Sequence, residues 1–201
     1  DGGNAVVSLA FTDAAGNVGA TTTSVTLSSE SIDATKPTIT GVTVADGTYK
    51  IGDTATVTIT AGNTETGLTV SSATFNGETL SSLTDNSDGT YTGVYTVVEG
   101  NTDVADGGNA VVSLAFTDAA GNVSATTTSV TLSSESIDAT KPTISGVSIT
   151  DSAMNIGDVV TATITVGNAA GQVLTLSSGT IGGFTLGSLS WVSDTSYTAT
   201  F

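Results

Sequence analysis

The sequence predicts an all-β protein made of tandem antiparallel β-sandwich domains, with about 105 residues per repeat. Three observations carry this prediction. Residues 1–39 recur as residues 106–144 with a single difference, Gly19 against Ser124. The composition is rich in Thr, Val, Ser and Gly and poor in helix-forming residues, and Thr and Val suit the pleated surface of a sheet. Short apolar stretches are separated by turn signals at roughly 8–12-residue intervals.

The repeat has the length of one small domain, which is too long for a solenoid turn or a propeller blade. Thr-Lys-Pro occurs at residues 35–37 and again at residues 140–142. Because Pro lacks an N–H and favours extended geometry before it, both places are expected to be linkers. We therefore expect three parts: residues 1–33, the C-terminal strands of one repeat; residues 34–138, a complete repeat; and residues 139–201, the N-terminal part of the next repeat.

The strands of the complete repeat can be read in order from its alternating pattern and turn residues. Residues 54–61 alternate strictly between apolar residues and Thr, which is typical of a half-buried strand. Asn76-Gly77 predicts a type I′ turn, and residues 85–89 and 118–122 predict two further turns. The expected strands are residues 38–45, 54–61, 68–75, 78–83, 90–98, 110–116 and 127–133.

Seven short strands in about 100 residues indicate a sandwich of the immunoglobulin type. Its expected core consists of inward-facing apolar residues on four strands: Val57, Ile59, Tyr91, Tyr95, Val97, Val112, Leu114, Phe116, Val130 and Leu132. The Cys…Trp…Cys pattern of antibody domains, in which a Trp packs against an inter-sheet disulfide, is absent. Trp191 aligns with Asp85, so this position is not a fixed part of the core.

The charge and the missing residue types exclude several classes of function. The formal net charge is −16, with three Lys and no His, Arg or Cys. A nucleic-acid binder needs a basic surface, which this chain lacks. The usual ligands of zinc, copper, haem and iron–sulfur clusters are absent, as are Ser–His and Cys–His nucleophiles. Oxygen atoms are the abundant metal donors that remain, which favours calcium or magnesium.

Two segments carry a resemblance to a known family. The first reads SIDATKPTI followed by GVTVADGTYKIGDTATVTIT, and the second reads VVSLAFTDAAGNV followed by a Thr-rich strand. They resemble the bacterial Ig-like repeats of very large surface adhesins, in particular the extender repeats of RTX-type, type I-secreted adhesins. The resemblance implies tandem β-sandwiches, Ca²⁺ in the linkers, export through a Gram-negative envelope, and a role in biofilm formation or surface attachment.

Acidic residues recur at the linkers and at the loops that should face them. In a sandwich of this strand order, the loop between the last two strands lies beside the incoming linker, and two other loops lie beside the outgoing one. Calcium needs about six to eight oxygen ligands, which converging loops can supply. The candidate ligands are Glu30, Asp33, Asp118 and Asn122 at the first junction, and Asp103, Asp106, Glu135 and Asp138 at the second. Alternatively, these residues are solvated surface acids that keep an exported protein soluble.

We therefore expect a non-catalytic structural extender, or stalk, of a secreted or surface-bound bacterial adhesin, with Ca²⁺ stiffening the junctions. Its expected partners are neighbouring repeats of the same chain or neighbouring copies arranged head to tail, without nucleic acid or membrane insertion. The alternatives are a self-assembling filament, sheath or surface-layer subunit completed by strand exchange, a glycan- or ligand-binding module, and an accessory domain of a carbohydrate enzyme. The partial repeats are expected to be completed by further residues of a longer chain or by another copy.

Overall fold

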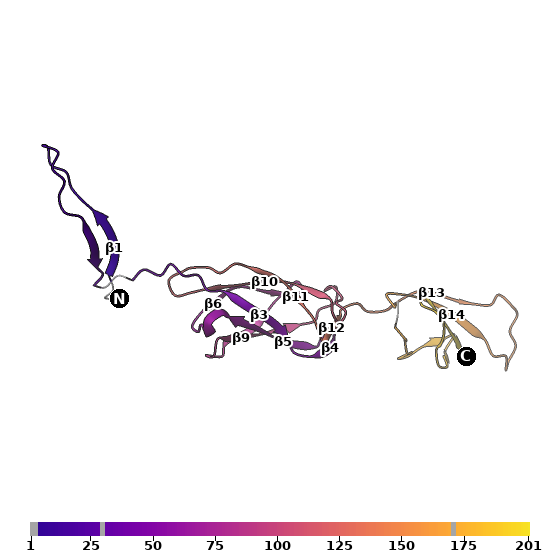
Figure 1. The fold of residues 1–201 in the computed structure, drawn as a ribbon. Helices are drawn as coiled ribbons and strands as arrows, with labels where there is room; N and C mark the ends of the chain where they lie inside the picture. The colour runs from indigo at the N-terminus through magenta and orange to yellow at the C-terminus, as the bar shows by residue number, and fades with distance from the viewer. Residues whose placement is uncertain (1–3, 29–30, 170–171) are drawn as a thin grey trace.

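A computed structural model describes residues 4–28, 31–169 and 172–201. Three parts follow one another along the chain: a hairpin, a central domain and a smaller third part (Figure 1). In the described residues the regular structure is β-strand, apart from one short 3-10 turn at Gly62–Thr64. None of the described segments forms a helix with the length and apolar character needed to cross a membrane.

The central domain consists of two antiparallel four-stranded sheets. The first has the order β3-β5-β9-β8 and the second has the order β11-β10-β6-β7. The strands of the first sheet are β3 (Ile39–Val44), β5 (Thr54–Ala61), β9 (Thr90–Thr96) and β8 (Ser81–Asp85). The strands of the second are β11 (Thr127–Thr131), β10 (Asn109–Thr117), β6 (Thr69–Phe75) and β7 (Glu78–Thr79). The predicted all-β sandwich is thereby confirmed.

Two details of the strand prediction are wrong. The predicted strand 78–83 is divided at Leu80, because β7 pairs with β6 in one sheet while β8 pairs with β9 in the other. Leu80 is buried where the chain crosses between the sheets. In addition, two short strands were not foreseen: β4 (Gly47–Lys50) and β12 (Glu135–Asp138) pair in parallel with each other. Strands of four residues carry too little alternation to be recognised in a sequence.

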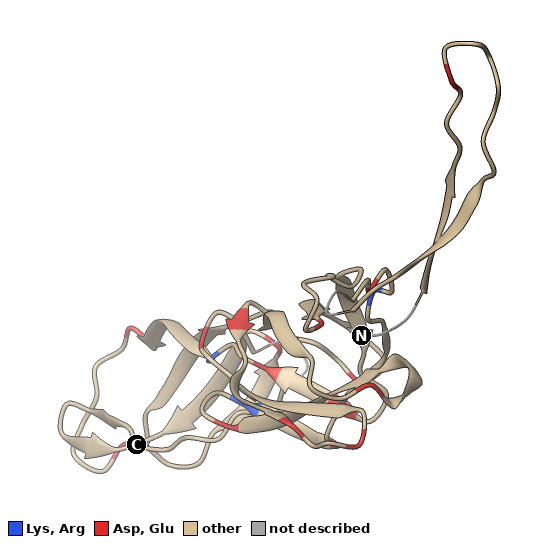
Figure 2. Ribbon diagram, turned by 90° about the vertical axis from the view of Figure 1, so that its left-hand side faces the viewer, with Lys and Arg blue, Asp and Glu red and all other residues tan. Residues whose placement is uncertain are grey.

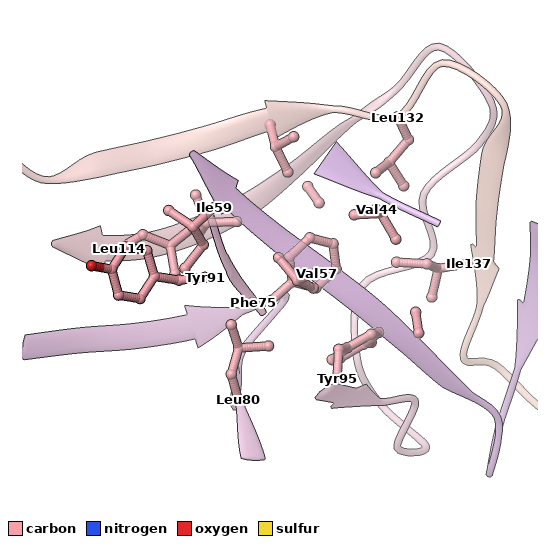
Figure 3. Close-up of a cluster of buried hydrophobic side chains, with 14 of the residues drawn as sticks. Val44, Val57, Ile59, Phe75, Leu80, Tyr91, Tyr95, Leu114, Leu132 and Ile137 are labelled. Carbon is pink, nitrogen blue, oxygen red and sulfur yellow. The ribbon is translucent and has the colours of Figure 1, made fainter. Parts of the chain in front are cut away.

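The core lies between the two sheets and contains the residues that the sequence predicts to face inward (Figure 3). Aromatic rings fill its centre. The Tyr91 and Phe116 rings are 4.6 Å apart and the Phe75 and Tyr95 rings are 4.8 Å apart, both in tilted arrangements that are favourable for aromatic pairs. Trp191, by contrast, is exposed on an edge strand of the third part.

A buried Tyr hydroxyl ties a loop to the core in both repeats. The Leu68 N–H donates to the Tyr91 hydroxyl at 2.9 Å, and burial raises the pKa of Tyr91. In the third part, the Leu174 N–H donates to the Tyr197 hydroxyl at 3.1 Å. Since a buried hydroxyl needs a partner, these bonds fix the backbone at Leu68 in the central domain and at Leu174 in the third part.

The third part contains one sheet of the same order as the first sheet of the central domain, β13-β14-β18-β17. Its apolar residues are less well covered. Ile149, which corresponds to Val44 in the repeat, is 45% exposed, whereas Val44 is 7% exposed. The strands are β13 (Thr143–Ile149), β14 (Thr161–Gly167), β18 (Ser196–Thr200) and β17 (Ser190–Ser193), with a small hairpin of β15 (Thr180–Ile181) and β16 (Phe184–Thr185).

The N-terminal hairpin repeats the structure of β10 and β11 without a second sheet to pack on. β1 (Asn4–Leu9) pairs with β2 (Thr22–Thr26) in the register that β10 and β11 adopt. Burial differs completely: Phe11 is 86% exposed and its counterpart Phe116 is 0% exposed. Pairing and register are therefore encoded locally, while burial depends on the opposite sheet.

Candidate junction sites

At the first junction, the loop between β10 and β11 contacts the incoming linker. Asp118 Oδ1 accepts hydrogen bonds from the Ala120 N–H at 2.9 Å and the Asn122 N–H at 2.8 Å. The Asn122 side-chain amide donates to Asp118 Oδ2 at 2.9 Å and to the Asp33 carbonyl oxygen at 3.2 Å. Asp33, Asp118 and Asn122 are thus brought together, as the strand order predicts, whereas Glu30 lies outside the described residues.

The same loop forms in the N-terminal hairpin. Asp13 Oδ1 accepts from the Ala15 and Asn17 N–H groups at 2.9 and 2.8 Å, and the Asn17 amide donates to Asp13 Oδ2 at 2.9 Å. The Asp–Asn pair therefore shapes its own turn, and contact with a linker is an additional role of the Asn side chain.

These hydrogen bonds lower the pKa of both carboxyl groups. For Asp118 and for Asp13 the Asn side-chain amide is the largest cause, and neighbouring backbone N–H groups add to it. A carboxyl group whose pKa is lower in the folded state stabilises that state above its ordinary pKa, and this stabilisation disappears as the pH falls through the lowered value. We expect both Asp side chains to titrate below the ordinary value of 3.8 in NMR carboxyl-shift measurements. An Asp118 or Asp13 midpoint at or above 3.8 contradicts the prediction.

At the second junction, two carboxylates hold the outgoing chain. Asp103 Oδ1 accepts from the Ala139 N–H at 2.7 Å. Asp138 Oδ1 accepts from the Thr140 N–H at 3.2 Å, and its Oδ2 accepts from the Gln172 side-chain amide at 2.8 Å. The Asp138 carboxylate therefore connects the central domain to the third part.

An exposed ion pair lies beside these contacts. Lys141 Nζ is 2.6 Å from Glu99 Oε2, and both side chains are more than half exposed. An exposed pair of this kind contributes little because water and salt screen it. The hydrogen bonds of Asp103 and Asp138 therefore define the junction more than this pair does.

Two of the acids that were expected beside the outgoing linker belong to a strand instead. Glu135 and Asp138 belong to β12, which pairs with β4, so the expectation of an unpaired linker here is wrong. Glu135 is buried, and its Oε2 accepts from the Ser133 and Ser134 N–H groups at 2.7 and 3.1 Å. It shapes the turn into β12. Asp106 is exposed in the turn before β10, and within the described ranges no hydrogen bond joins it to the other candidate ligands.

The described residues offer a poor fit to a calcium cage. Residues 4–28, 31–169 and 172–201 contain no group of three or more carboxylates placed to hold a metal ion. The oxygen atoms of Asp118, Asp103, Asp138 and Glu135 already accept hydrogen bonds, which an ion would have to replace. Calcium at the junctions stays a prediction, and the contacts present are hydrogen bonds.

The role of Gln172 could not be read from the pattern of acids. Gln172 lies near the single residue by which the third part is longer than the central repeat, and this difference in loop length was the available signal. It reaches back to Asp138 from the loop that the Tyr197 hydroxyl holds, since this hydroxyl donates to the Gln172 carbonyl oxygen at 3.1 Å. Gln172 is thus held by two bonds: its side-chain amide donates to Asp138, and its carbonyl oxygen accepts from the Tyr197 hydroxyl.

Replacing Asp138 by Ala is expected to loosen the second junction while the central domain stays folded. The substitution removes the acceptor of the Gln172 and Thr140 bonds, and Asp138 is outside the apolar core. NMR relaxation should show the third part reorienting more freely relative to the central domain. Asp106→Ala, an exposed acid without these bonds, is the matched control, and equal relaxation in both variants would show that Asp138 does not join the two parts.

The family comparison agrees with the fold. The model of the bacterial Ig-like domain family matches residues 33–134. A comparison with curated proteins returned no match. The solved structure of FdeC, an Escherichia coli adhesin, aligns with a TM-score of 0.36 and 24% sequence identity over 87% of this chain, and the aligned region spans 56% of that chain. On the family match, this chain belongs to the bacterial Ig-like domain family.

Proposed function

We propose that the chain is a structural extender of a bacterial surface adhesin, in which repeats placed end to end form a stalk. The observation that carries the proposal is the placing of the two linkers. The incoming linker contacts the loop between β10 and β11, and the outgoing chain leaves beside Asp103, at the other end of the sandwich (Figure 1). Because the chain enters the domain at one end and leaves it at the opposite end, each domain adds its own length to the stalk.

Rigidity in this proposal comes from packing and from hydrogen bonds at the junctions. The core makes each sandwich a stiff unit, and the bonds of Asn122 to Asp33 and of Gln172 to Asp138 restrict the angle between neighbouring units. Acidic residues are spread along the ribbon of the central domain, with few basic residues among them (Figure 2). Their mutual repulsion disfavours the collapse of one repeat onto another.

The extender is proposed to be non-catalytic and to act outside the cell. This chain contains no His or Cys for nucleophilic catalysis, and its family match is to an Ig-like domain, a kind of domain that is typically non-enzymatic. The location at the bacterial surface rests on the resemblance of the two quoted segments to adhesin repeats.

Chains that contain one, two and three copies of residues 34–138 in series provide the test. We expect the maximum dimension from small-angle X-ray scattering to grow by a constant increment with each copy. A maximum dimension that grows more slowly with each copy would indicate that the repeats fold back on one another, which contradicts a stalk. Saturable binding of a glycan to the single copy would favour the binding-module alternative.

The proposal also includes Ca²⁺ that stiffens the junctions, because the resemblance to adhesin extender repeats implies calcium in the linkers. A ligand that binds only the folded state raises the unfolding free energy by RT ln(1+[L]/Kd), about 2.7 kcal/mol at a hundredfold excess over Kd. We expect a higher melting temperature and a narrower spread of junction angles in calcium than in chelator. Magnesium at the same concentration is the control for ionic strength, and unchanged melting and scattering in calcium would remove the metal from the proposal.

Strand exchange between copies is a second proposal, favoured by one specific observation. Leu9 and Phe11 are exposed on the hairpin, whereas their counterparts Leu114 and Phe116 are buried against a sheet like that of the third part. The hairpin of one copy would then cover the third part of another. Sedimentation should show concentration-dependent assembly that Leu9→Asp abolishes, and a monomer at all concentrations contradicts this proposal.

A further inference from the structure

We propose that the parallel pair β4–β12 is a mechanical clamp that resists unfolding when the chain is pulled from both ends. The inference rests on the proposed stalk, because a stalk is the setting in which the domain would bear tension. The clamp itself is a property of the central domain alone. It joins a strand near the entry of the domain to the strand at its exit.

The residue pairs between β4 and β12 are consecutive, and further hydrogen bonds lie just before and just after them. Glu135, Ser136, Ile137 and Asp138 lie opposite Gly47, Thr48, Tyr49 and Lys50 respectively. Before the ladder, the Gly47 N–H donates to the Ser134 carbonyl oxygen at 3.4 Å. Beyond it, Asp103 holds the Ala139 N–H, and Ala139 is fully buried.

β12 is also held on its other side. The Ile137 N–H donates to the Val104 carbonyl oxygen at 2.8 Å, and the Val104 N–H donates back to the Ile137 carbonyl oxygen at 2.9 Å. Successive backbone groups of a strand point to opposite sides. Because Ile137 faces Val104, the N–H and carbonyl of Ser136 face β4.

The direction of pulling decides how these bonds are stressed. Tension enters through the chain before β3 and leaves through residues 140–142, after β12. Since β4 and β12 are parallel, β4 is drawn toward its beginning and β12 toward its end, so the strands slide past each other and all their hydrogen bonds are strained together. If β3 detaches from β5, β4 is still fastened to β12, and the domain cannot extend until this pair breaks.

The clamp strand depends on its partner. The tripeptide Ser-Ile-Asp of β12 recurs at residues 31–33, where it forms no strand and Ile32 is 73% exposed. In β12 the corresponding Ile137 is 3% exposed. The segment is therefore ordered by β4 and the core beneath it, which makes the pair a specific connection between the entry and the exit of the domain.

Force spectroscopy in two directions on the same chain tests the clamp. The chain contains no Cys, so introduced Cys residues provide unique handles. Thr35→Cys with Thr143→Cys pulls the domain from end to end and slides the strands. Lys50→Cys with Thr143→Cys pulls both strands from the same end, so that the bonds open one at a time. We expect the first geometry to unfold at a severalfold higher force, because forced unfolding follows the barrier along the pulling direction.

A pair of variants assigns the resistance to the clamp. Ser136→Pro removes an N–H that faces β4, whereas Val130→Ala truncates a core residue on β11, away from the pair. We expect Ser136→Pro to lower the end-to-end force toward the value of the other geometry, and Val130→Ala to leave most of it. Melting followed by circular dichroism verifies that each variant is folded.

Equal unfolding forces in the two directions would overturn the clamp, even if Ser136→Pro failed to fold. Such a result would leave the stalk untouched, since the stalk is tested by the increase in length per copy. Conversely, repeats that fold back in scattering would remove the stalk while a directional difference in force would still support the clamp. The two inferences therefore fail separately.

Discussion

Replacing Phe116 by Ala is expected to lower the unfolding free energy of the central domain by about 3–5 kcal/mol. Phe116 is fully buried, and its ring packs at 4.6 Å from that of Tyr91 in the centre of the core. The substitution removes apolar contact and leaves a cavity that surrounding strands cannot close. Since small domains have a stability of about 5–15 kcal/mol, this is a large share of the total. Urea unfolding followed by tyrosine fluorescence measures it.

The repeat supplies a matched control in the same chain. Phe11 occupies the same place in a nearly identical sequence but is exposed on the hairpin. Phe11→Ala is expected to leave the unfolding of the central domain unchanged. A small effect of Phe116→Ala, comparable to that of Phe11→Ala, would mean that β10 does not pack with its predicted face inward.

Replacing Gly89 by Ala is expected to be the second most costly of the substitutions considered. Gly89 has a φ of +87°, and an added Cβ would collide with the backbone of Thr64. The left-handed conformation costs a residue with a Cβ about 1–2 kcal/mol. The collision adds about 1–3 kcal/mol, as overpacking does elsewhere. Thermal unfolding of the variant should show the combined loss.

Gly121→Ala measures the cost of the left-handed conformation without the collision. Gly121 has a φ of +91°, close to that of Gly89, but nothing lies within 4 Å of its Cβ position. Only the conformational cost of about 1–2 kcal/mol is therefore expected. If both substitutions destabilise the domain equally, the contact between Gly89 and Thr64 is not tight.

The predicted core of the central domain follows from the sequence because it rests on a simple physical rule. Side chains alternate across a strand, so Val112, Leu114 and Phe116 had to share one face. The turn at Asn76-Gly77 is equally local, and both residues have the positive φ that a type I′ turn needs. The positions of the Asp118 loop and the incoming linker followed from the strand order, which the family of sandwiches shares.

The junction acids were harder to interpret from the sequence. An acidic residue between two strands can bind a metal, accept backbone hydrogen bonds or remain solvated, and its identity does not distinguish these roles. The structure assigns backbone and amide donors to Asp103, Asp118 and Asp138, and it buries Glu135 at the start of β12. Gln172 was not predicted because it is an uncharged amide in a lengthened loop, outside the pattern of acids on which the junction prediction rests.

The sequence by itself determined the repeat, the sandwich, the inward faces and the turn at Asn76-Gly77, because these depend on residue periodicity and on turns within a few residues. Only the tertiary structure decided the pairing of β4 with β12 and the hydrogen-bond partners of the junction acids. Asp103 accepts from Ala139, and Asp138 accepts from Gln172. These contacts join segments that lie far apart in the chain, and the periodicity of a single segment cannot specify them.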